Sequence, residues 1–282
     1  MRRKAGAGEP AEGEPAQGAV SSALQKLEGI RGCRVGLFAE ALEGPLAGAG
    51  FGVAEDEAFP SASLIKVLVL LDLLRRADSG GLSLEDELTV GTDDLVEGSE
   101  MLGAVRPPAR VSCRELAVGM ITASDNAATN LLIRRLGMGR IDALAGGLGL
   151  RRTRLRREMV DLGARSRGEE NTTSARGRVA LVREIWAGSS LMERSRELAI
   201  GLLLDARTSS KIPVPHAPGA RYAHKTGELD GVENDAGIFL LPGLSFAVAV
   251  LVEGDVGRAV EPLSEALRVI CRFLAGGDGT RA

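Results

Sequence analysis

The sequence predicts an α/β protein of the α+β type, in which an antiparallel five-stranded sheet from both chain ends is flanked by helices, plus a mainly helical lobe. Three observations predict this class. Two strand-like stretches lie near the start of the chain, about three lie near its end, and helical spacing dominates between them. Terminal hairpins can join into one antiparallel sheet, which leaves the central helices to cover one face or to form a lobe.

The first elements switch from helical to strand spacing and back. Residues 21–30 (SSALQKLEGI) have helical spacing, whereas residues 34–42 and 46–54 alternate like two strands joined by a Glu-Gly-Pro turn. The stretch FPSASLIKVLVLLDLLRR then predicts a helix from about Ser63 to Arg76.

The middle of the chain is predicted to be helical. Residues 112–137 predict two helices interrupted by the Ser-Asp-Asn sequence at 124–126, and residues 139–150 predict a weaker helix. The charged stretch 151–171 predicts a surface loop, and loops of that length are usually functional or disordered. Two more helices are predicted, one capped by Thr173 or Ser174 and ending near Trp186, and one over residues 192–207.

The end of the chain predicts a loop, strands and a last helix. Residues 209–223 carry three prolines and predict the loop. The charge-free stretch 236–252 could imitate a membrane span, but Pro242 and Gly243 split it into a β-hairpin. We therefore expect no membrane span, and we expect a final helix over residues 261–275.

Composition bounds the class of protein. The chain has 282 residues, 44% of them hydrophobic, and a formal net charge of −3, which suits one large domain or two closely packed parts. So small a net charge provides no field that would gather nucleic acid or an anionic membrane. Residues 1–17, rich in Gly, Pro, Ala and Glu, predict a disordered tail. One domain is predicted over residues 18–282, with a sheet part at about 18–60 and 210–282 and a helical lobe at about 61–209.

The start of the chain is basic, but no apolar stretch of a signal peptide follows. The sequence as written therefore predicts a cytoplasmic protein, or an exported one if a leader was removed. Cys33, Cys113 and Cys271 are widely spaced, which argues against a disulfide framework and against a zinc site. With only His216 and His224 present, a Ser-His-Asp triad has few candidates, and we interpret His224 as structural.

Ser63 and Lys66 form the first candidate motif. Residues three apart on a helix share a face, and the first turn offers unpaired N–H groups and the positive dipole end to a developing oxyanion. Burial among leucine and valine would lower the pKa of Lys66, so that it could take the proton of the Ser63 hydroxyl. The alternative is a capping serine followed by a lysine that extends to solvent. Only five of the 35 basic residues are lysines, so each one is informative.

Two more short motifs follow along the chain. The Ser-Asp-Asn sequence at 124–126 is either a turn between helices or a proton relay followed by an amide that holds a substrate carbonyl. The Lys-Thr-Gly sequence at 225–227 is either an ordinary strand end or a strand edge that binds a carboxylate, where glycine admits a close backbone approach.

The three motifs in this order resemble the class A β-lactamases and the penicillin-recognising serine acyltransferases related to them. The resemblance covers about residues 20–275 and includes the stretches DLVEGSEML, MITASDNAATNLLI and HKTGELDGVENDAGIF. It implies an active site between the sheet and the helical lobe, with no metal and no organic cofactor. It also implies a small-molecule substrate, either a β-lactam or a cell-wall peptide, and we expect a monomer without a nucleic-acid partner.

The resemblance implies three catalytic side chains. Ser63 would be the acylated nucleophile, Lys66 its general base or part of the proton path, and Ser124 the relay that passes a proton to the leaving nitrogen. The backbone N–H groups of Ser63 and Glu228 would form the oxyanion hole.

The resemblance also implies the residues that hold the substrate and the loop. Asn126 would bond to the side-chain amide of the substrate, and Lys225 and Thr226 would bind its carboxylate beside Gly227. Asn130 matches a residue that ties down the long loop, and we expect one arginine of the cluster 151–157 to help pin it.

The sequence departs from the family in the loop that carries the deacylating glutamate. Met159 falls at the glutamate position in a gapless alignment, whereas a one-residue deletion places Glu158 there, and Asp161 is a further candidate. The stretch RREMVD also resembles a branch of this fold that lacks the glutamate. In addition, Gly98 replaces an aromatic residue at the cleft rim, and no arginine follows the Lys-Thr-Gly sequence on its strand to help hold a carboxylate.

Three functional hypotheses follow from the sequence. The first is a serine enzyme that hydrolyses β-lactams through an acyl-enzyme on Ser63. The second is a D-Ala-D-Ala-type peptidase or an esterase of the same fold with slow deacylation. The third is a non-catalytic protein that binds a cell-wall peptide or a β-lactam in the same cleft.

Overall fold

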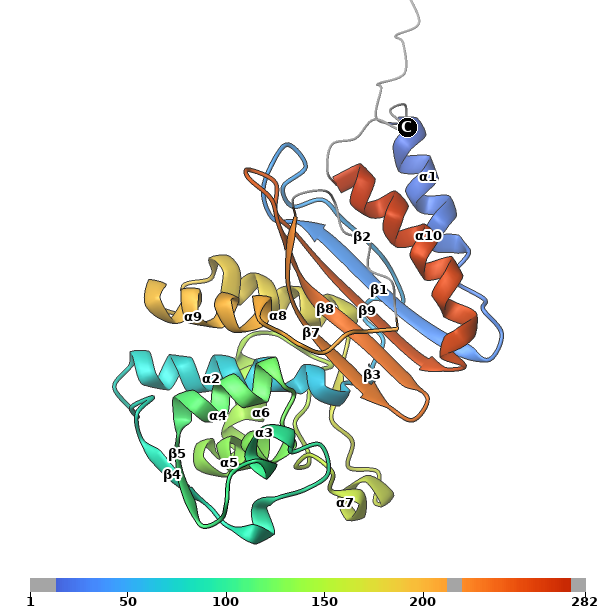
Figure 1. Cartoon of the computed structure of the whole chain (residues 1–282). Helices are drawn as coiled ribbons and strands as arrows, with labels where there is room; N and C mark the ends of the chain where they lie inside the picture. The colour runs from blue at the N-terminus through green and yellow to red at the C-terminus, as the bar shows by residue number, and fades with distance from the viewer. Residues whose placement is uncertain (1–13, 212–219, 275–282) are drawn as a thin grey trace, which may run out of the picture.

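The computed structural model describes residues 14–211 and 220–274, and its sheet is the predicted one (Figure 1). Five strands pair antiparallel in the order β2-β1-β9-β8-β7, so strands from the two chain ends share one sheet. The strands span Cys33–Ala41 (β1), Gly50–Val53 (β2), Arg221–Leu229 (β7), Val232–Leu240 (β8) and Phe246–Gly254 (β9). β8 and β9 confirm the hairpin predicted across residues 236–252. Because β7 is an edge strand, one side of it is open to a cleft.

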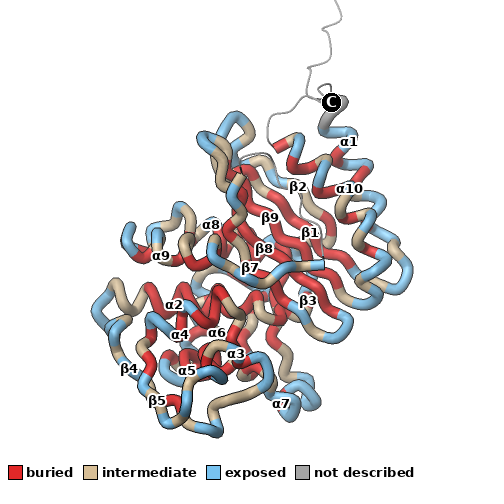
Figure 2. Tube along the Cα trace, in the orientation of Figure 1, coloured by how far each residue is buried: buried red, intermediate tan, exposed pale blue. Residues whose placement is uncertain are grey.

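One face of the sheet is covered by the helices of the two chain ends, α1 (Glu14–Gln25) and α10 (Val256–Leu274) (Figure 1). Leu263, Leu267 and Ile270 recur at helical spacing on α10 and are fully buried against β1 and β9. This apolar stripe fixes α10 on the sheet. Figure 2 shows the central parts of the strands beneath it as buried.

The opposite face is covered by α8 (Ala175–Ala187), which contributes Val179 and Val182 to a core with Ile238, Ala249 and Leu251 of the sheet. Beyond α8 lies the helical lobe, which has its own buried core (Figure 2). Its helices span Lys66–Asp78 (α2), Glu100–Gly103 (α3), Cys113–Thr122 (α4), Asn126–Leu136 (α5), Met138–Gly147 (α6), Leu162–Ser166 (α7) and Glu193–Leu204 (α9). α2, almost wholly buried, forms the centre of this lobe.

Several elements differ from the sequence-based expectations. α1 begins at Glu14, inside the tail predicted for residues 1–17, because Pro15 is tolerated in a first helical turn; residues 1–13 lie outside the described residues. The helix expected from Ser63 begins instead as a 3-10 turn at Ala62–Ile65 (η1), and α2 starts at Lys66. Two short ribbons were not predicted, β3–β6 (Phe59–Pro60 with Thr172–Thr173) and β4–β5 (Glu87–Val90 with Ala109–Ser112). Strands this short carry too little alternation to be recognised.

Within residues 14–211 and 220–274, no helix is both long enough and apolar enough to cross a membrane. His216 lies outside the described residues. The three cysteines are free thiols; Cys113 and Cys271 are buried, whereas Cys33 is only half-buried.

Candidate active site

Lys66 lies at the first position of α2, and its ammonium group is completely buried where the sheet meets the helical lobe. Its Nζ donates to the carbonyl oxygen of Ser124 at 2.6 Å, to the Ser124 hydroxyl at 3.1 Å and to Asn126 Oδ1 at 2.8 Å. The first and second motifs therefore meet in space. In the described part of the chain, none of the hydrogen bonds of Lys66 goes to Ser63.

Burial holds the pKa of Lys66 well below its usual value, and the nearby positive charge of Lys225 lowers it further, while Asp125 acts in the opposite direction. Ser124 and Asn126 offer only dipoles to this ammonium group. An amine in such a place can exist in its neutral form and accept a proton.

Ser63 is half-buried in the 3-10 turn that precedes α2. Ala62, directly before it, has φ 45°, and Ser124 has φ 57°, in the left-handed region that side chains rarely adopt. Val160, in the long loop, has φ 63°. Two of the four non-glycine residues with positive φ in the described chain therefore lie at these motifs and a third lies in the long loop, and such strain concentrates at functional sites.

The Ser124–Asn126 turn is held rigidly by Asp125, which is fully buried. Its Oδ1 accepts from the N–H of Ala128 and so caps α5, while its Oδ2 accepts from the N–H groups of Met101 and Leu102 at 3.0 Å each. One carboxylate thus joins α5 and α3 behind the turn. The two flanking residues are left to bond Lys66.

Gly98 adjoins this turn at the rim of the cleft. Its carbonyl oxygen accepts from the N–H of Asn126, and its φ is 71°. A Cβ atom added to Gly98 would lie 2.7 Å from Asn126 Nδ2, which in turn donates to the carbonyl of Glu97 at 2.8 Å. In this conformation an aromatic residue at position 98 would displace the Asn126 amide.

The third motif lies on β7, whose backbone approaches the turn that carries Ser63. A Cβ atom added to Gly227 would lie 3.0 Å from Ser61 O, 3.1 Å from Ala62 Cβ and 3.1 Å from Ser63 N. Only glycine permits this approach without displacing one of the two backbones. It brings the N–H of Ser63 beside the strand that contains Lys225 and Glu228.

Gly227→Ala should therefore push β7 away from the turn. We expect a loss of about 1–3 kcal/mol in the free energy of unfolding, as for overpacked cores, together with slower acylation of Ser63. Chemical denaturation and single-turnover kinetics measure the two effects. Gly201→Ala on α9, where a Cβ atom meets nothing within 4 Å, is the matched control. It should lower neither the free energy of unfolding nor the acylation rate.

Lys225 is buried and donates from Nζ to the carbonyl of Thr226 at 2.9 Å. Burial lowers its pKa to about 8, against the opposing effect of Asp235. The neighbouring side chains point to the other face of β7: Thr226 Oγ1 donates to Thr208 Oγ1 at 2.7 Å, and His224 Nδ1 bonds to Asp235 at 2.9 Å. His224 therefore lies opposite Lys225, in the structural position that the sequence predicts.

The three motifs open onto one cleft of about 400 Å³. Its lining residues come from the nucleophile turn, the turn before α5, the segment after α9, and strands β7 and β8: Ser63, Ser124, Asn126, Arg207, Thr208, Ser209, Thr226, Glu228 and Glu233. All three motifs thus meet in one place, with Lys66 and Lys225 buried behind the surface of the cleft. Among the described residues, no cluster of His, Cys, Asp and Glu side chains is placed to hold a metal ion.

Arg178, on α8, is a buried residue of this region that the sequence did not single out. Its guanidinium donates to the carbonyl oxygen of Leu64 at 2.6 Å and to Thr173 Oγ1 at 2.7 Å, and burial lowers its pKa to about 9. It therefore braces the residue after Ser63 from behind. Only the tertiary fold brings position 178 to position 64, so no local pattern could have identified it.

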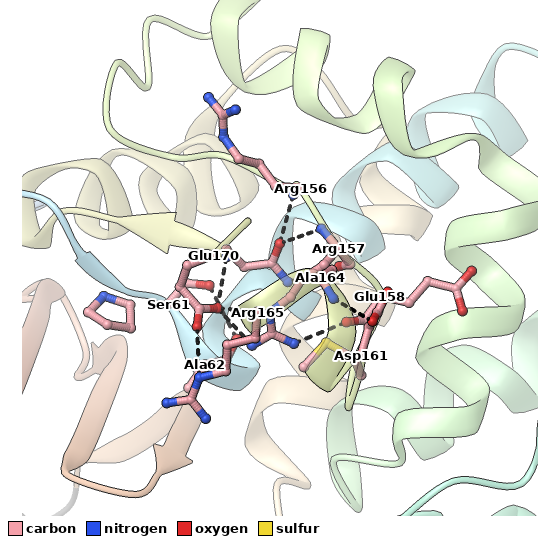
Figure 3. A network of polar contacts seen from close by, with 12 residues as sticks. Ser61, Ala62, Arg156, Arg157, Glu158, Asp161, Ala164, Arg165 and Glu170 are labelled. Atoms are coloured by element: carbon pink, nitrogen blue, oxygen red, sulfur yellow. Dashed lines mark hydrogen bonds and ion pairs between the residues drawn. The ribbon is translucent and has the colours of Figure 1, made fainter. Parts of the chain in front are cut away.

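The long loop is anchored by Asn130, as the resemblance implies. Its Nδ2 donates to the carbonyl of Met159 at 3.1 Å, and its Oδ1 accepts from the N–H of Met159 at 2.7 Å. Met159 is 7% exposed and belongs to the core of the helical lobe. Glu158 instead bonds to Arg134 at 2.8 Å, and Figure 3 shows its side chain extending away from Ser61 and Ala62. Asp161 caps α7 through the N–H of Ala164.

The base of the loop is pinned beside the nucleophile turn. Buried Arg157 pairs with Glu170 at 2.7 Å, which makes it the pinning arginine expected within 151–157 (Figure 3). Asn171 Oδ1 accepts from the N–H groups of Arg156 and Arg157, while its carbonyl accepts from the N–H of Ser61 at 2.8 Å. Asn171 therefore joins the loop to the turn that carries Ser63.

Comparison with known proteins agrees with this geometry. Residues 19–272 match the model of the β-lactamase enzyme family. A β-lactamase of Streptomyces albus G is 31% identical over 275 residues, which cover 91% of this chain and 86% of that protein. A β-lactamase of Streptomyces fradiae is 33% identical over 250 residues, covering 85% and 80% of the two chains.

Solved structures agree as well. PBP-A superimposes with a TM-score of 0.82 at 28% identity, covering 92% of this chain and 96% of that one. A mutant of PBP-A, solved as its acyl-enzyme complex with penicillin G, gives a TM-score of 0.83 at 28% identity and covers 92% and 97% of the two chains. An ancestral class A β-lactamase gives 0.80 at 27% identity, covering 90% and 99%. The chain belongs to the β-lactamase enzyme family and has the fold of its class A members.

Proposed function

We propose that this protein is a serine hydrolase that opens the amide bond of β-lactams through an acyl-enzyme on Ser63. One observation carries the proposal: a fully buried lysine, bonded to Ser124 and Asn126, lies one helical turn after a half-buried serine at the edge of the cleft. Neutral Lys66 takes the proton as Ser63 Oγ attacks the carbonyl carbon. The C–N bond then breaks, and Ser124 passes a proton to the leaving nitrogen.

The remaining residues bind and polarise the substrate. The N–H groups of Ser63 and Glu228 would stabilise the oxyanion, since Gly227 holds their two segments together. Protonated Lys225 and the Thr226 hydroxyl would bind the substrate carboxylate, and Asn126 the side-chain amide. All these groups lie on three of the five segments that enclose the cleft: the nucleophile turn, the turn at the start of α5, and β7.

The test is hydrolysis of a chromogenic cephalosporin by the wild-type protein and by Ser63→Ala. We expect measurable hydrolysis by the wild type and none above background with the variant. Equal rates for both proteins would refute the assignment of Ser63 as the nucleophile.

The environment of the loop favours slow deacylation as a second feature of the reaction. The side chain of Asn130 binds the backbone of Met159 on both sides, and the Met159 side chain is buried. Glu158 is instead paired with Arg134 on the outer side of the loop. Neither candidate supplies a carboxylate to activate water in the cleft. This favours a long-lived acyl-enzyme, as a peptidase or esterase of this fold would form with a penicillin. A protein that only binds its ligand would instead be stabilised by penicillin without any covalent adduct.

The pKa values predict a bell-shaped dependence of acylation on pH. Lys225 must carry its proton to bind a carboxylate, so kcat/KM should fall as the pH rises through about 8. Lys66 must be neutral, so the rate should fall again on the acidic side. Steady-state or single-turnover kinetics between pH 5 and pH 10 measure the profile. Lys225→Arg, which keeps its charge at every pH, should lose the alkaline limb, and an unchanged limb would contradict the role of Lys225.

A further inference from the structure

Two glutamates face each other on the strands that form one wall of the cleft. Glu228 on β7 pairs in register with Glu233 on β8, and both line the cavity that contains Ser63 and Thr226. Glu228 is well exposed, whereas Glu233 is only 2% exposed. A pair of carboxylates at this place is unexpected in a cleft proposed to bind an anionic substrate.

One lysine lies between the two carboxylates. Lys211 Nζ forms a close ion pair with Glu228, and it lies 3.3 Å from Glu233 Oε2. Glu233 Oε1 accepts from the backbone N–H of Lys211 at 2.9 Å, but Oε2 is buried without a hydrogen bond among the described residues. With both glutamates ionised, the three side chains carry a net charge of −1.

The negative charge lies close to the proposed carboxylate site. Thr226 and Glu228 are two residues apart on β7 and so share a face, about 7 Å apart along the strand. Arg207 lies at another edge of the cleft, where its N–H bonds to the carbonyl of Thr122 and where it also lines a neighbouring cavity with Met101. The cleft therefore has basic groups at Lys225 and Arg207, and an acidic wall next to Thr226.

We propose that this acidic wall, Glu228 and Glu233, selects substrates that carry a cationic group beside their carboxylate. This inference rests on the function proposed above. A substrate cation would lie over Glu228, attracted by the uncompensated charge of the pair. It would compete with Lys211, whose ammonium group already occupies that place.

Two cephalosporins form a matched pair of probes. Cephaloridine and cephalothin share the 2-thienylacetamido side chain and the ring carboxylate, and they differ at C3′, where the first carries a pyridinium and the second a neutral acetoxy group. The acylation rate constant is measured for each in single turnover with enzyme in excess, so that slow deacylation does not interfere. The ratio of the two constants, cationic over neutral, is compared between variants, which removes the intrinsic difference in reactivity.

The variants should move this ratio in opposite directions. Glu233→Gln and Glu228→Gln should each lower it by about threefold to tenfold, since each removes a negative charge. Lys211→Ala should raise it, because the competing cation is gone. The wild-type ratio should also fall as salt is added. Lys26→Ala, which breaks a remote surface pair with Glu265, is the control and should leave the ratio unchanged.

Two outcomes would overturn the inference. A ratio that is the same in the wild type, Glu228→Gln and Lys211→Ala would show that the wall has no influence on the substrate. A shift in the same direction for removal of a glutamate and of the lysine would show that general packing, not charge, is responsible. In both cases acylation of Ser63 persists and the proposed function stands. If neither compound acylates Ser63, the proposed function itself fails, and the inference with it.

Discussion

Replacing Lys66 with methionine is expected to slow the acylation of Ser63 by about 10²- to 10⁴-fold, the usual contribution of a positioned general base. Methionine fills similar space but cannot accept a proton. Three observations support this expectation. Lys66 is buried, its pKa is lowered, and it bonds to Ser124 and Asn126. The measurement is the rate of adduct formation with a penicillin in single turnover.

The stability of the same variant separates catalysis from folding. Burial lowers the pKa of Lys66, so folding at neutral pH releases a proton that the unfolded chain holds, and this release opposes folding. Lys66→Met should therefore unfold at the same temperature as the wild type or above it. A variant that acylates at the wild-type rate would contradict the role of Lys66. Impaired acylation with a strongly lowered Tm would point to a structural role instead.

Replacing Met159 with glutamate should shorten the lifetime of the acyl-enzyme by about 10²- to 10⁴-fold, because it introduces a base at the inward position of the loop. Asn130 holds the backbone of Met159 on both sides, so the new side chain would start from the same place. A carboxylate among apolar neighbours destabilises the fold, and we expect a lower Tm as well. The lifetime is read from the return of free enzyme by intact-mass measurement.

Two controls accompany this prediction. Met159→Gln has the shape of glutamate without its basicity and should leave the lifetime long. Glu158→Gln should also have no effect, since the carboxylate of Glu158 is bound to Arg134 on the outer side of the loop. A longer lifetime in Glu158→Gln would identify Glu158 as the base of the wild-type protein and would overturn our reading of the loop.

The sequence was sufficient to predict the five-stranded sheet and to identify the three motifs in their order. Alternation marked β1 and β2, the Pro242-Gly243 turn marked the β8–β9 hairpin, and the stretch 261–275 was predicted as the last helix. All of these are local patterns. The 3-10 turn at Ala62–Ile65 was predicted as α-helix because both share the same spacing of apolar residues over one turn.

Contacts between distant segments could not be predicted from the sequence. Nothing in the local sequence distinguishes Arg178 from the other arginines. Only the packing of α8 against the nucleophile turn brings it to Leu64. Likewise, Lys211 and Glu233 become neighbours through the return of β7 and β8. The sequence alone could not decide whether Met159 or Glu158 occupies the glutamate position of the family, because both alignments fit the motif equally well. The hydrogen bonds of Asn130 to Met159 decide it.

The most direct test of the account is the mass of the intact protein over time after addition of penicillin G, with peptide mapping of the modified residue. We expect a mass increase of one penicillin, located on Ser63, that persists for minutes to hours and is absent in Ser63→Ala. An adduct on another residue, or none at all despite binding, would contradict it.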